Sequence, residues 1–302
     1  MRTDPTGRVL VVGDIATDIL AVLPAPLSGG LALGTDTAVR IGLSAGGSAA
    51  NTAAWLATTG TPVTLIGAVG TDDAGAARLA ELTAAGVDCA VERVAGNTGA
   101  IVVLSDPADR TMLCDRGANH LLSPAHVTAA VRDAGARHLH LSAYPLFDEG
   151  SRPAALAALA AARDAGLTTS IDAASAAPLR AAGDAAADWL RGTDLLFANL
   201  DEARVLVGDP AADPADAARA LTALARSVVV KLGPDGAVRA TADDLVRVPA
   251  VAVEAVDPTG AGDAFAAGLL AAELSGADPA ASLRAGATLG ARAVATLGAR
   301  PR

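Results

Sequence analysis

The sequence predicts an α/β fold in which helices cover both faces of a mostly parallel sheet. Short aliphatic and β-branched runs alternate with alanine-rich helical segments, at a spacing that suits right-handed crossover connections. The 302 residues are enough to bury one large core. Two irregular stretches interrupt the alternation, and they predict a few extra strands that project from the main body.

Six runs have the continuous apolar character of buried parallel strands. The first, RVLVVGD, ends in Gly-Asp, which predicts a buried strand with a polar exit. The six runs are residues 8–14, 63–70, 137–142, 167–172, 194–199 and 227–233.

Helices are predicted between these runs. Residues 47–60 lack proline and end in Gly60, and residues 72–87 carry acids in the first turn and a glycine where the helix should stop. Two further helical segments are residues 153–166 and 213–225.

The irregular stretches lie at about residues 15–45 and 97–118. The first contains proline and glycine turns, and the second predicts a hairpin with the turn DPADR at 106–110. Neither contains a crossover helix. We expect antiparallel strands that form a β-rich lid over a site, within a single domain spanning residues 1–302.

Composition and charge exclude several classes of partner. The chain has 23 basic and 33 acidic side chains, a net charge of −10, and no block of basic residues, so nucleic acid and anionic membranes are not expected partners. Apolar runs such as residues 264–272 fall short of the roughly 20 residues that span a bilayer. The first residues lack an apolar signal core, and Cys89 and Cys114 are expected to be reduced thiols. These features predict a cytoplasmic protein.

The segment DPTGAGDAFAAG (257–268) is the strongest candidate for an anion site. Gly260, Ala261, Gly262 and Asp263 immediately precede an apolar helical pattern. Unpaired amides at a helix N-terminus favour a phosphate or a developing oxyanion, and glycines allow close approach. The alternative is that Asp263 only caps its own helix.

Polar residues also follow the predicted strands. Ligands of open parallel sheets bind beyond the carboxyl ends of the strands, so these residues are candidates for one site. Lys231 stands out because it is the only lysine in the chain. The candidates are Asp14, Asp18, Ser142, Asp172, Asn199 with Glu202, and Lys231 with Gly233.

Other motifs fit less well. The GAG segment lacks the third glycine of a dinucleotide-binding fingerprint, and Lys231 does not follow a glycine as in a Walker A loop. GLSAG (42–46) matches a nucleophile elbow around Ser44, but no histidine follows His140 to complete a triad. His138 and His140 lie on one strand face, and without a third ligand nearby we expect them to be packed rather than metal-bound.

Together, the motifs resemble the ribokinase-like, PfkB-type carbohydrate kinases. The resemblance runs from about Val9 to Gly298 and rests on GGSAAN (46–51), residues 69–88, DRGAN (115–119), NLDE (199–202), VKLGPDGA (230–237) and the GAGD segment. It implies a ribokinase-like three-layer α/β/α sandwich with a small β-rich lid. The implied reaction is ATP-dependent phosphorylation of a sugar hydroxyl.

The resemblance also implies roles for residues. Asp263 would be the general base, and the amides of Gly260, Ala261 and Gly262 would hold the transferring phosphoryl group. The acceptor would bind at Asp18, Gly46, Gly47 and Asn51. ATP would bind at Asn199, Lys231, Gly233, Gly236 and Gly262, and Glu202 with Asn199 would orient Mg²⁺ mainly through water. Candidate K⁺ positions are Asp257, Thr259, Val294 and Gly298.

The substrate is predicted to be a sugar or sugar acid. Ala16 stands where ribokinases carry asparagine, and Ser142 or a neighbour replaces an acidic residue, which disfavours ribose. A nucleoside acceptor is the alternative, but aromatic residues make up 2% of the chain, with none in the predicted lid. Arg116 would favour an acidic sugar if it points into the cleft. A non-catalytic binding protein is a further alternative, and a homodimer paired through an apolar lid face is expected.

Overall fold

The main sheet organises the molecule. The computed structural model describes residues 7–27, 30–31, 33–105 and 110–301. Over these residues, nine strands form one sheet with the order β13 (Leu245–Val248), β12 (Ala237–Ala240), β11 (Ala225–Lys231), β10 (Thr193–Asn199), β9 (Thr168–Asp172), β8 (Ala136–Ser142), β1 (Arg8–Val12), β4 (Val63–Gly70) and β5 (Asp88–Val94).

The pairing is parallel from β5 to β11, and β12 and β13 add an antiparallel edge. The six predicted strands are β1, β4, β8, β9, β10 and β11, and all six are confirmed. Their continuous apolar runs are explained by burial on both faces.

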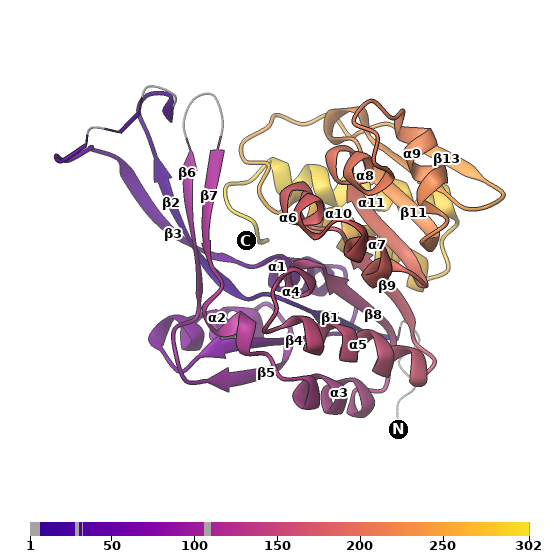
Figure 1. Cartoon of the computed structure of the whole chain (residues 1–302), viewed down its shortest axis with the longest axis horizontal. Coiled ribbons are helices and arrows are strands. Elements are labelled where there is room, and N and C mark those ends of the chain that lie inside the picture. The colour runs from indigo at the N-terminus through magenta and orange to yellow at the C-terminus, as the bar shows by residue number, and fades with distance from the viewer. Residues whose placement is uncertain (1–6, 28–29, 32, 106–109, 302) are drawn as a thin grey trace.

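Helices cover both faces of this sheet (Figure 1). One layer packs through buried residues such as Leu159, Leu190 and Leu221, and the other through residues such as Trp55, Leu82 and Leu269. The first layer comprises α3 (Pro124–Asp133), α4 (Tyr144–Phe147), α5 (Arg152–Asp164), α6 (Ala176–Ala182), α7 (Asp184–Leu190), α8 (Leu200–Val207) and α9 (Pro214–Leu221). The second comprises α1 (Ser48–Thr58), α2 (Asp73–Ala84), α10 (Ala261–Leu274) and α11 (Pro279–Val294).

Successive side chains of each strand point to opposite faces of the main sheet, so the hydrophobic core has two parts, one on each face. On β1, Leu10 and Val12 face the first helical layer, whereas Val9 and Val11 face the second. Small alanine side chains let the helices lie close to the sheet, and Ala49, Ala53, Ala154 and Ala158 are fully buried. This arrangement confirms the predicted three-layer α/β/α sandwich.

A second sheet projects to one side of the sandwich (Figure 1). Its strand order is β3 (Arg40–Gly46), β2 (Ala16–Val22), β6 (Gly99–Ser105) and β7 (Arg110–Asp115), and all four strands lie within the two segments predicted to form the lid. Two pairings are antiparallel, but β2 pairs with β6 in parallel, so the sheet is mixed. Residues 106–109 of the predicted turn DPADR (106–110) lie outside the described residues. The single-domain organisation stays a prediction.

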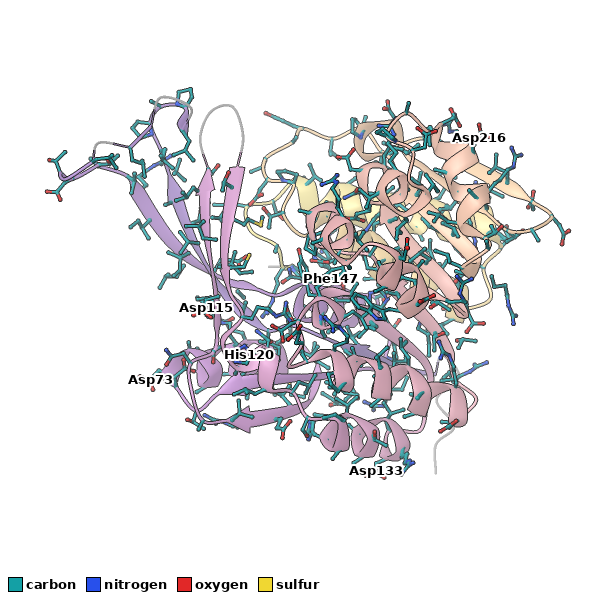
Figure 2. The ribbon with its side chains drawn as sticks, viewed as in Figure 1. Asp73, Asp115, His120, Asp133, Phe147 and Asp216 are labelled. Atoms are coloured by element: carbon teal, nitrogen blue, oxygen red, sulfur yellow. The ribbon has the colours of Figure 1, made fainter. Side chains whose placement is uncertain are left out.

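Several of the acidic side chains that give the chain its negative net charge lie on the surface. Asp73, Asp133 and Asp216 are exposed at the periphery, whereas Phe147 packs inward against Trp189 (Figure 2). In the described part of the chain, no helix combines the length and apolarity needed to cross a membrane. The cytoplasmic location stays a prediction.

Candidate active site

The carboxyl ends of the central strands bring the predicted polar residues together. Ser142 on β8 is in register with Asp172 on β9, and Asn199 on β10 is in register with Lys231 on β11. Parallel strands end at the same edge of a sheet, so residues far apart in sequence become neighbours there.

Asp263 lies in the first turn of α10, but it does not cap its own helix. Its Oδ1 accepts a hydrogen bond from Ser48 Oγ at 2.8 Å, and its Oδ2 accepts one from Asn51 Nδ2 at 3.0 Å. Both donors belong to α1, which packs against α10. The carboxylate therefore faces across the site toward the acceptor motif.

Desolvation raises the pKa of Asp263 to about 7. The nearby carboxylate of Asp172 adds to the increase, while the hydrogen bonds from Asn51 and Ser48 and the charge of Lys231 oppose it. A carboxylate with a pKa near neutrality can accept a proton from a hydroxyl and still be ionised at physiological pH.

The GAGD loop requires glycine at position 260. Gly260 has φ 76°, in the left-handed region, and a Cβ there would collide with the carbonyl of Ala299. A Cβ on Gly262 would lie 3.2 Å from Lys231 Nζ. The loop therefore places the start of α10, with its partial positive charge, directly beside the ammonium of Lys231. The Ala261 amide also donates to the Pro258 carbonyl at 3.3 Å.

Lys231 pairs with Asp172 at 2.5 Å. Burial disfavours the ammonium form, but Asp172 and Glu202 outweigh this effect, and the pKa of Lys231 is raised. Asp172 also accepts a hydrogen bond from the amide of Ala174, a non-glycine residue with φ 69°. Strained backbone of this kind is typical of functional sites.

Asn199 and Glu202 form a capping box at the start of α8. The backbone and side-chain nitrogens of Asn199 each donate to Glu202 at 2.7 Å, and the Glu202 amide donates back to Asn199 Oδ1 at 2.9 Å. Burial raises the pKa of Glu202, which is 2% exposed, and Lys231 opposes the increase. The two predicted Mg²⁺-orienting residues thus lie together, next to the Lys231–Asp172 pair.

A pocket of about 860 Å³ opens beside Lys231. It contains three of the predicted nucleotide-binding residues, Asn199, Lys231 and Gly233, together with Arg247, which the sequence did not indicate. Gly236 lies outside its lining, and its φ of 93° and close approach to the Val248 carbonyl give it a turn role.

The predicted acceptor residues form one cluster. A Cβ on Gly46 would collide with the Asp18 carboxylate, and a Cβ on Gly47, which has φ 93°, would collide with the Asp14 carbonyl. Desolvation raises the pKa of Asp18 to about 6, against the charges of Arg300 and Arg78. The Asp18 Oδ1 atom is buried without a hydrogen-bond partner, as a group that binds a substrate hydroxyl would be.

The four candidate K⁺ positions also lie together. Asp257 accepts hydrogen bonds at 2.9 Å from the amides of Thr259 and Gly298, and the amides of Val256 and Asp257 donate to the carbonyl of Val294. These contacts join the loop before α10 to the segment after α11. The role of these positions in K⁺ binding stays a prediction.

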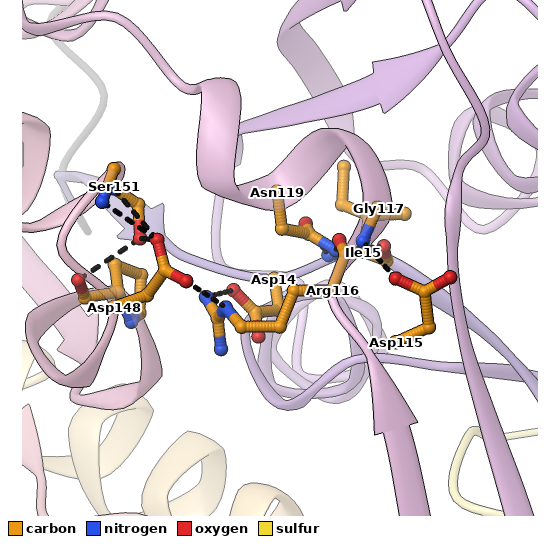
Figure 3. A network of polar contacts seen from close by, with 10 residues as sticks. Asp14, Ile15, Asp115, Arg116, Gly117, Asn119, Asp148 and Ser151 are labelled. Atoms are coloured by element: carbon orange, nitrogen blue, oxygen red, sulfur yellow. Dashed lines mark hydrogen bonds and ion pairs between the residues drawn. The ribbon is translucent and has the colours of Figure 1, made fainter.

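Arg116 belongs to an ion-pair network (Figure 3). Its Nη2 donates to Asp14 at 2.9 Å, and its Nε lies 3.7 Å from Asp148. Beside it, Asn119 exchanges two hydrogen bonds of 2.9 Å with the backbone of Ile15. The network anchors the base of the second sheet, so the charge of Arg116 is already matched and gives little support to an acidic sugar.

The two paired histidines have a packed role, as expected. His138 contacts Thr168 and Ser170, and His140 contacts the same Ser170 hydroxyl at 2.8 Å. Burial lowers the pKa of His138 to about 3 and that of His140 to about 4, so both rings are neutral.

Besides Arg247, sequence reasoning missed two residues that contact Asp263 or the acceptor cluster. Ser48 lies within GGSAAN and could have been found, because positions three apart on a helix share a face with Asn51. Arg300 contacts Asn51 and Gly46, but nothing in its local sequence indicates this contact.

The comparison with known families decides the assignment. The sequence profile described as "pfkB family carbohydrate kinase" matches residues 7–302. The chain belongs to the pfkB family of carbohydrate kinases. It is therefore a phosphotransferase acting on an alcohol group, as the sequence predicted.

Individual members of the pfkB family are similar along most of the chain. An ATP-dependent ribose-1-phosphate kinase of Halopiger xanaduensis is 36% identical over 266 residues, which cover 85% of this chain and 82% of the relative. A structure described as a ribokinase II of E. coli with ATP and Mg²⁺ is 26% identical, with a TM-score of 0.84 over 97% of this chain and 94% of that chain. An adenosine kinase of Sinorhizobium meliloti shares the fold, with 24% identity and a TM-score of 0.86 over 98% and 96%.

Proposed function

We propose that this pfkB-family chain transfers the γ-phosphoryl group of ATP to a hydroxyl of a sugar, a sugar phosphate or a sugar acid. The observation that carries the proposal is the Asp263 carboxylate, held by Ser48 and Asn51 beside the GAGD amides and Lys231. The sugar phosphate is included because the Halopiger relative is a ribose-1-phosphate kinase. ATP and Mg²⁺ are supported by the E. coli structure that contains both.

In this mechanism Asp263 is the general base. The acceptor oxygen attacks the γ-phosphorus while its proton passes to the Asp263 carboxylate, and the bond to the β-phosphate oxygen breaks to release ADP. The amides of Gly260, Ala261 and Gly262, with Lys231, stabilise the charge on the transferring group.

The substrates occupy the two sides of this centre. ATP lies in the pocket at Asn199, Lys231 and Gly233 and reaches Gly262 with its phosphates. The acceptor lies against Gly46 and Gly47 and bonds to Asp18 and Asn51, under the second sheet. Glu202 and Asn199 would hold Mg²⁺ through its water molecules, using the oxygen lone pairs that their mutual hydrogen bonds leave free, and the ion would supply neutralisation of phosphate charge.

A nucleoside is the second candidate acceptor. Tyr144 lies within electrostatic reach of both Asp263 and Asp14, and burial and these carboxylates raise its pKa. This aromatic ring at the site favours a stacked base. We prefer a sugar because Trp55 is buried in the core and Phe147 is already packed against both Tyr144 and Trp189, so neither offers a second ring face for a stacked base.

We also propose a homodimer formed through the second sheet. Asp18 lies on the face of this sheet toward the site, and alternation places Ile41, Leu43 and Leu113 on the opposite face. These three side chains are 67%, 73% and 56% exposed. An apolar sheet face left in water favours pairing with a second copy.

The test measures ADP release from Mg-ATP with pentoses, hexoses, their phosphates, sugar acids and nucleosides. Wild type should turn over one class, and Asp263→Asn should lower kcat by about 10²–10⁴-fold. Turnover of nucleosides alone would replace the sugar proposal with the second candidate. ATP binding without turnover of any acceptor would support a non-catalytic binding protein. Replacing KCl with tetramethylammonium chloride in the same assay tests the candidate K⁺ positions, and equal rates would contradict them.

A further inference from the structure

Arg300 lies where the segment after α11 passes the acceptor cluster. Its Nε donates to Asn51 Oδ1 at 3.1 Å and its Nη2 donates to the Gly46 carbonyl at 2.7 Å, while Nη1 lies 3.9 Å from Glu81. The side chain is only 11% exposed. The guanidinium fork has fixed donor directions, so it sets the geometry of the groups it contacts.

Two hydrogen bonds hold the backbone of this segment just before Arg300. The amide of Gly298 donates to Asp257 at 2.9 Å, and the carbonyl of Ala299 accepts a 2.9 Å hydrogen bond from Trp55 Nε1. Arg300 therefore reaches Asn51 from a fixed position.

The contact with Arg300 determines which way the Asn51 amide points. A side-chain amide has an acceptor oxygen on one side and a donor nitrogen on the other, whereas a guanidinium only donates. Arg300 therefore donates to the amide oxygen of Asn51, and the amide nitrogen of Asn51 is free to donate to Asp263 at 3.0 Å. A flipped amide would place its oxygen against the carboxylate and repel it.

We propose that Arg300 is a positioning residue for the base, acting through Asn51 to hold the Asp263 carboxylate toward the acceptor hydroxyl. The proposal rests on the proposed function, because it assigns Arg300 a part in that reaction. Arg300 itself touches neither reacting oxygen.

The test compares Arg300→Met and Arg300→Lys with Arg292→Met as the matched control. Arg292 is an exposed arginine of α11 whose guanidinium lies over the Trp55 ring. Arg300→Met should lower kcat by roughly 10- to 100-fold, as expected for a misplaced catalytic group, and leave the KM for Mg-ATP unchanged. Arg300→Lys, which keeps the charge but not the fork, should recover only part of the rate. An Arg300→Met enzyme with wild-type kcat would overturn the proposal.

The pH profile separates positioning from folding stability. The charged and titratable groups around Asp263 are Lys231, Asp172, Tyr144 and Arg300. Loss of the Arg300 charge and of an ordered Asn51 donor both favour the protonated acid, so the acid limb of kcat/KM should move to higher pH in Arg300→Met. A lowered melting temperature with an unmoved acid limb would indicate a structural role only and would contradict the proposal.

A second readout needs no acceptor. The chain has four asparagines and no glutamine, so its ¹⁵N spectrum contains four side-chain amide pairs, and Asn51→Ser identifies the pair from Asn51. In wild type the chemical shifts of this pair should change as Asp263 ionises, with a midpoint near pH 7. In Arg300→Met the midpoint should rise, and an unchanged titration would overturn the inference. Wild type that shows this titration but phosphorylates nothing would contradict the proposed function and leave the Arg300–Asn51–Asp263 geometry in place.

Discussion

At the scale of single residues, the site depends on carboxylates that are kept out of water. Asp263 and Asp18 both have raised pKa values because desolvation outweighs the nearby positive charges. Asp263 gains reactivity from this, since a weaker acid is a stronger base. The same burial has a cost in folding stability, and the two effects have opposite dependences on pH.

The raised pKa of Asp263 makes the free energy of unfolding depend on pH. The unfolded chain loses this proton near pH 3.8 and the folded chain near pH 7, so the folded state binds more protons between these values. The free energy of unfolding therefore falls as the pH rises through this window, whereas kcat/KM rises toward pH 7 as the base ionises. Asp263→Asn should melt a few degrees above wild type at pH 8 and level with it near pH 4, as measured by calorimetry.

The exposed Asp133→Asn variant is the control for the stability measurement, because it removes a charge without changing a buried site. It should follow wild type at both pH values. An Asp263→Asn protein that is less stable than wild type at pH 8 would contradict the assigned cause of the shift.

At the scale of elements, the start of α10 is fixed by its contact with the segment after α11. Gly260 has φ 76°, and a Cβ there would collide with the Ala299 carbonyl oxygen, so a side chain does not fit. Because α10 and α11 also pack along their lengths, the position of the first α10 amides depends on a segment 39 residues later in the chain.

Gly260→Ala should lower the free energy of unfolding by about 1–3 kcal/mol and reduce kcat at least tenfold, because the loop must shift from the transferring group. Gly276→Ala is the matched control, since Gly276 has φ 86° after the end of α10 but open space around it. Urea unfolding and kcat should separate the two variants. Equal losses of stability with normal kcat in both would show that only backbone strain matters at Gly260.

At the scale of the whole molecule, the two sheets contribute different parts of the candidate site. The buried main sheet fixes the ends of β9, β10 and β11, whereas the second sheet supplies Asp18 on one face and an apolar surface on the other. A dimer through that surface would hold the second sheet over the acceptor cluster.

Leu43→Arg should convert a dimer to monomer in sedimentation equilibrium, because a charge would have to be buried at the interface. Leu156→Arg on α5 is the control, since Leu156 is 40% exposed on a different surface. A wild-type protein that sediments as a monomer at all concentrations would contradict the dimer.

The sequence by itself predicted six strands of the main sheet and the layers, and it named the strand-end residues that the structure brings together. Continuous apolar runs identify buried parallel strands, and polar residues at the strand ends follow from that topology. Strands β5, β12 and β13 and the parallel pairing of β2 with β6 were not predicted, because they depend on pairing between segments with weak local patterns.

Only the tertiary structure decided how these residues are oriented. Local sequence allowed Asp263 to cap α10 and left the partner of Arg116 open. Packing directs Asp263 to α1 and Arg116 to Asp14. Arg300 reaches Asn51 across 249 residues of sequence. A residue type and its neighbours determine which bonds are possible, but the partner that is used depends on which segments the fold brings within about 3 Å.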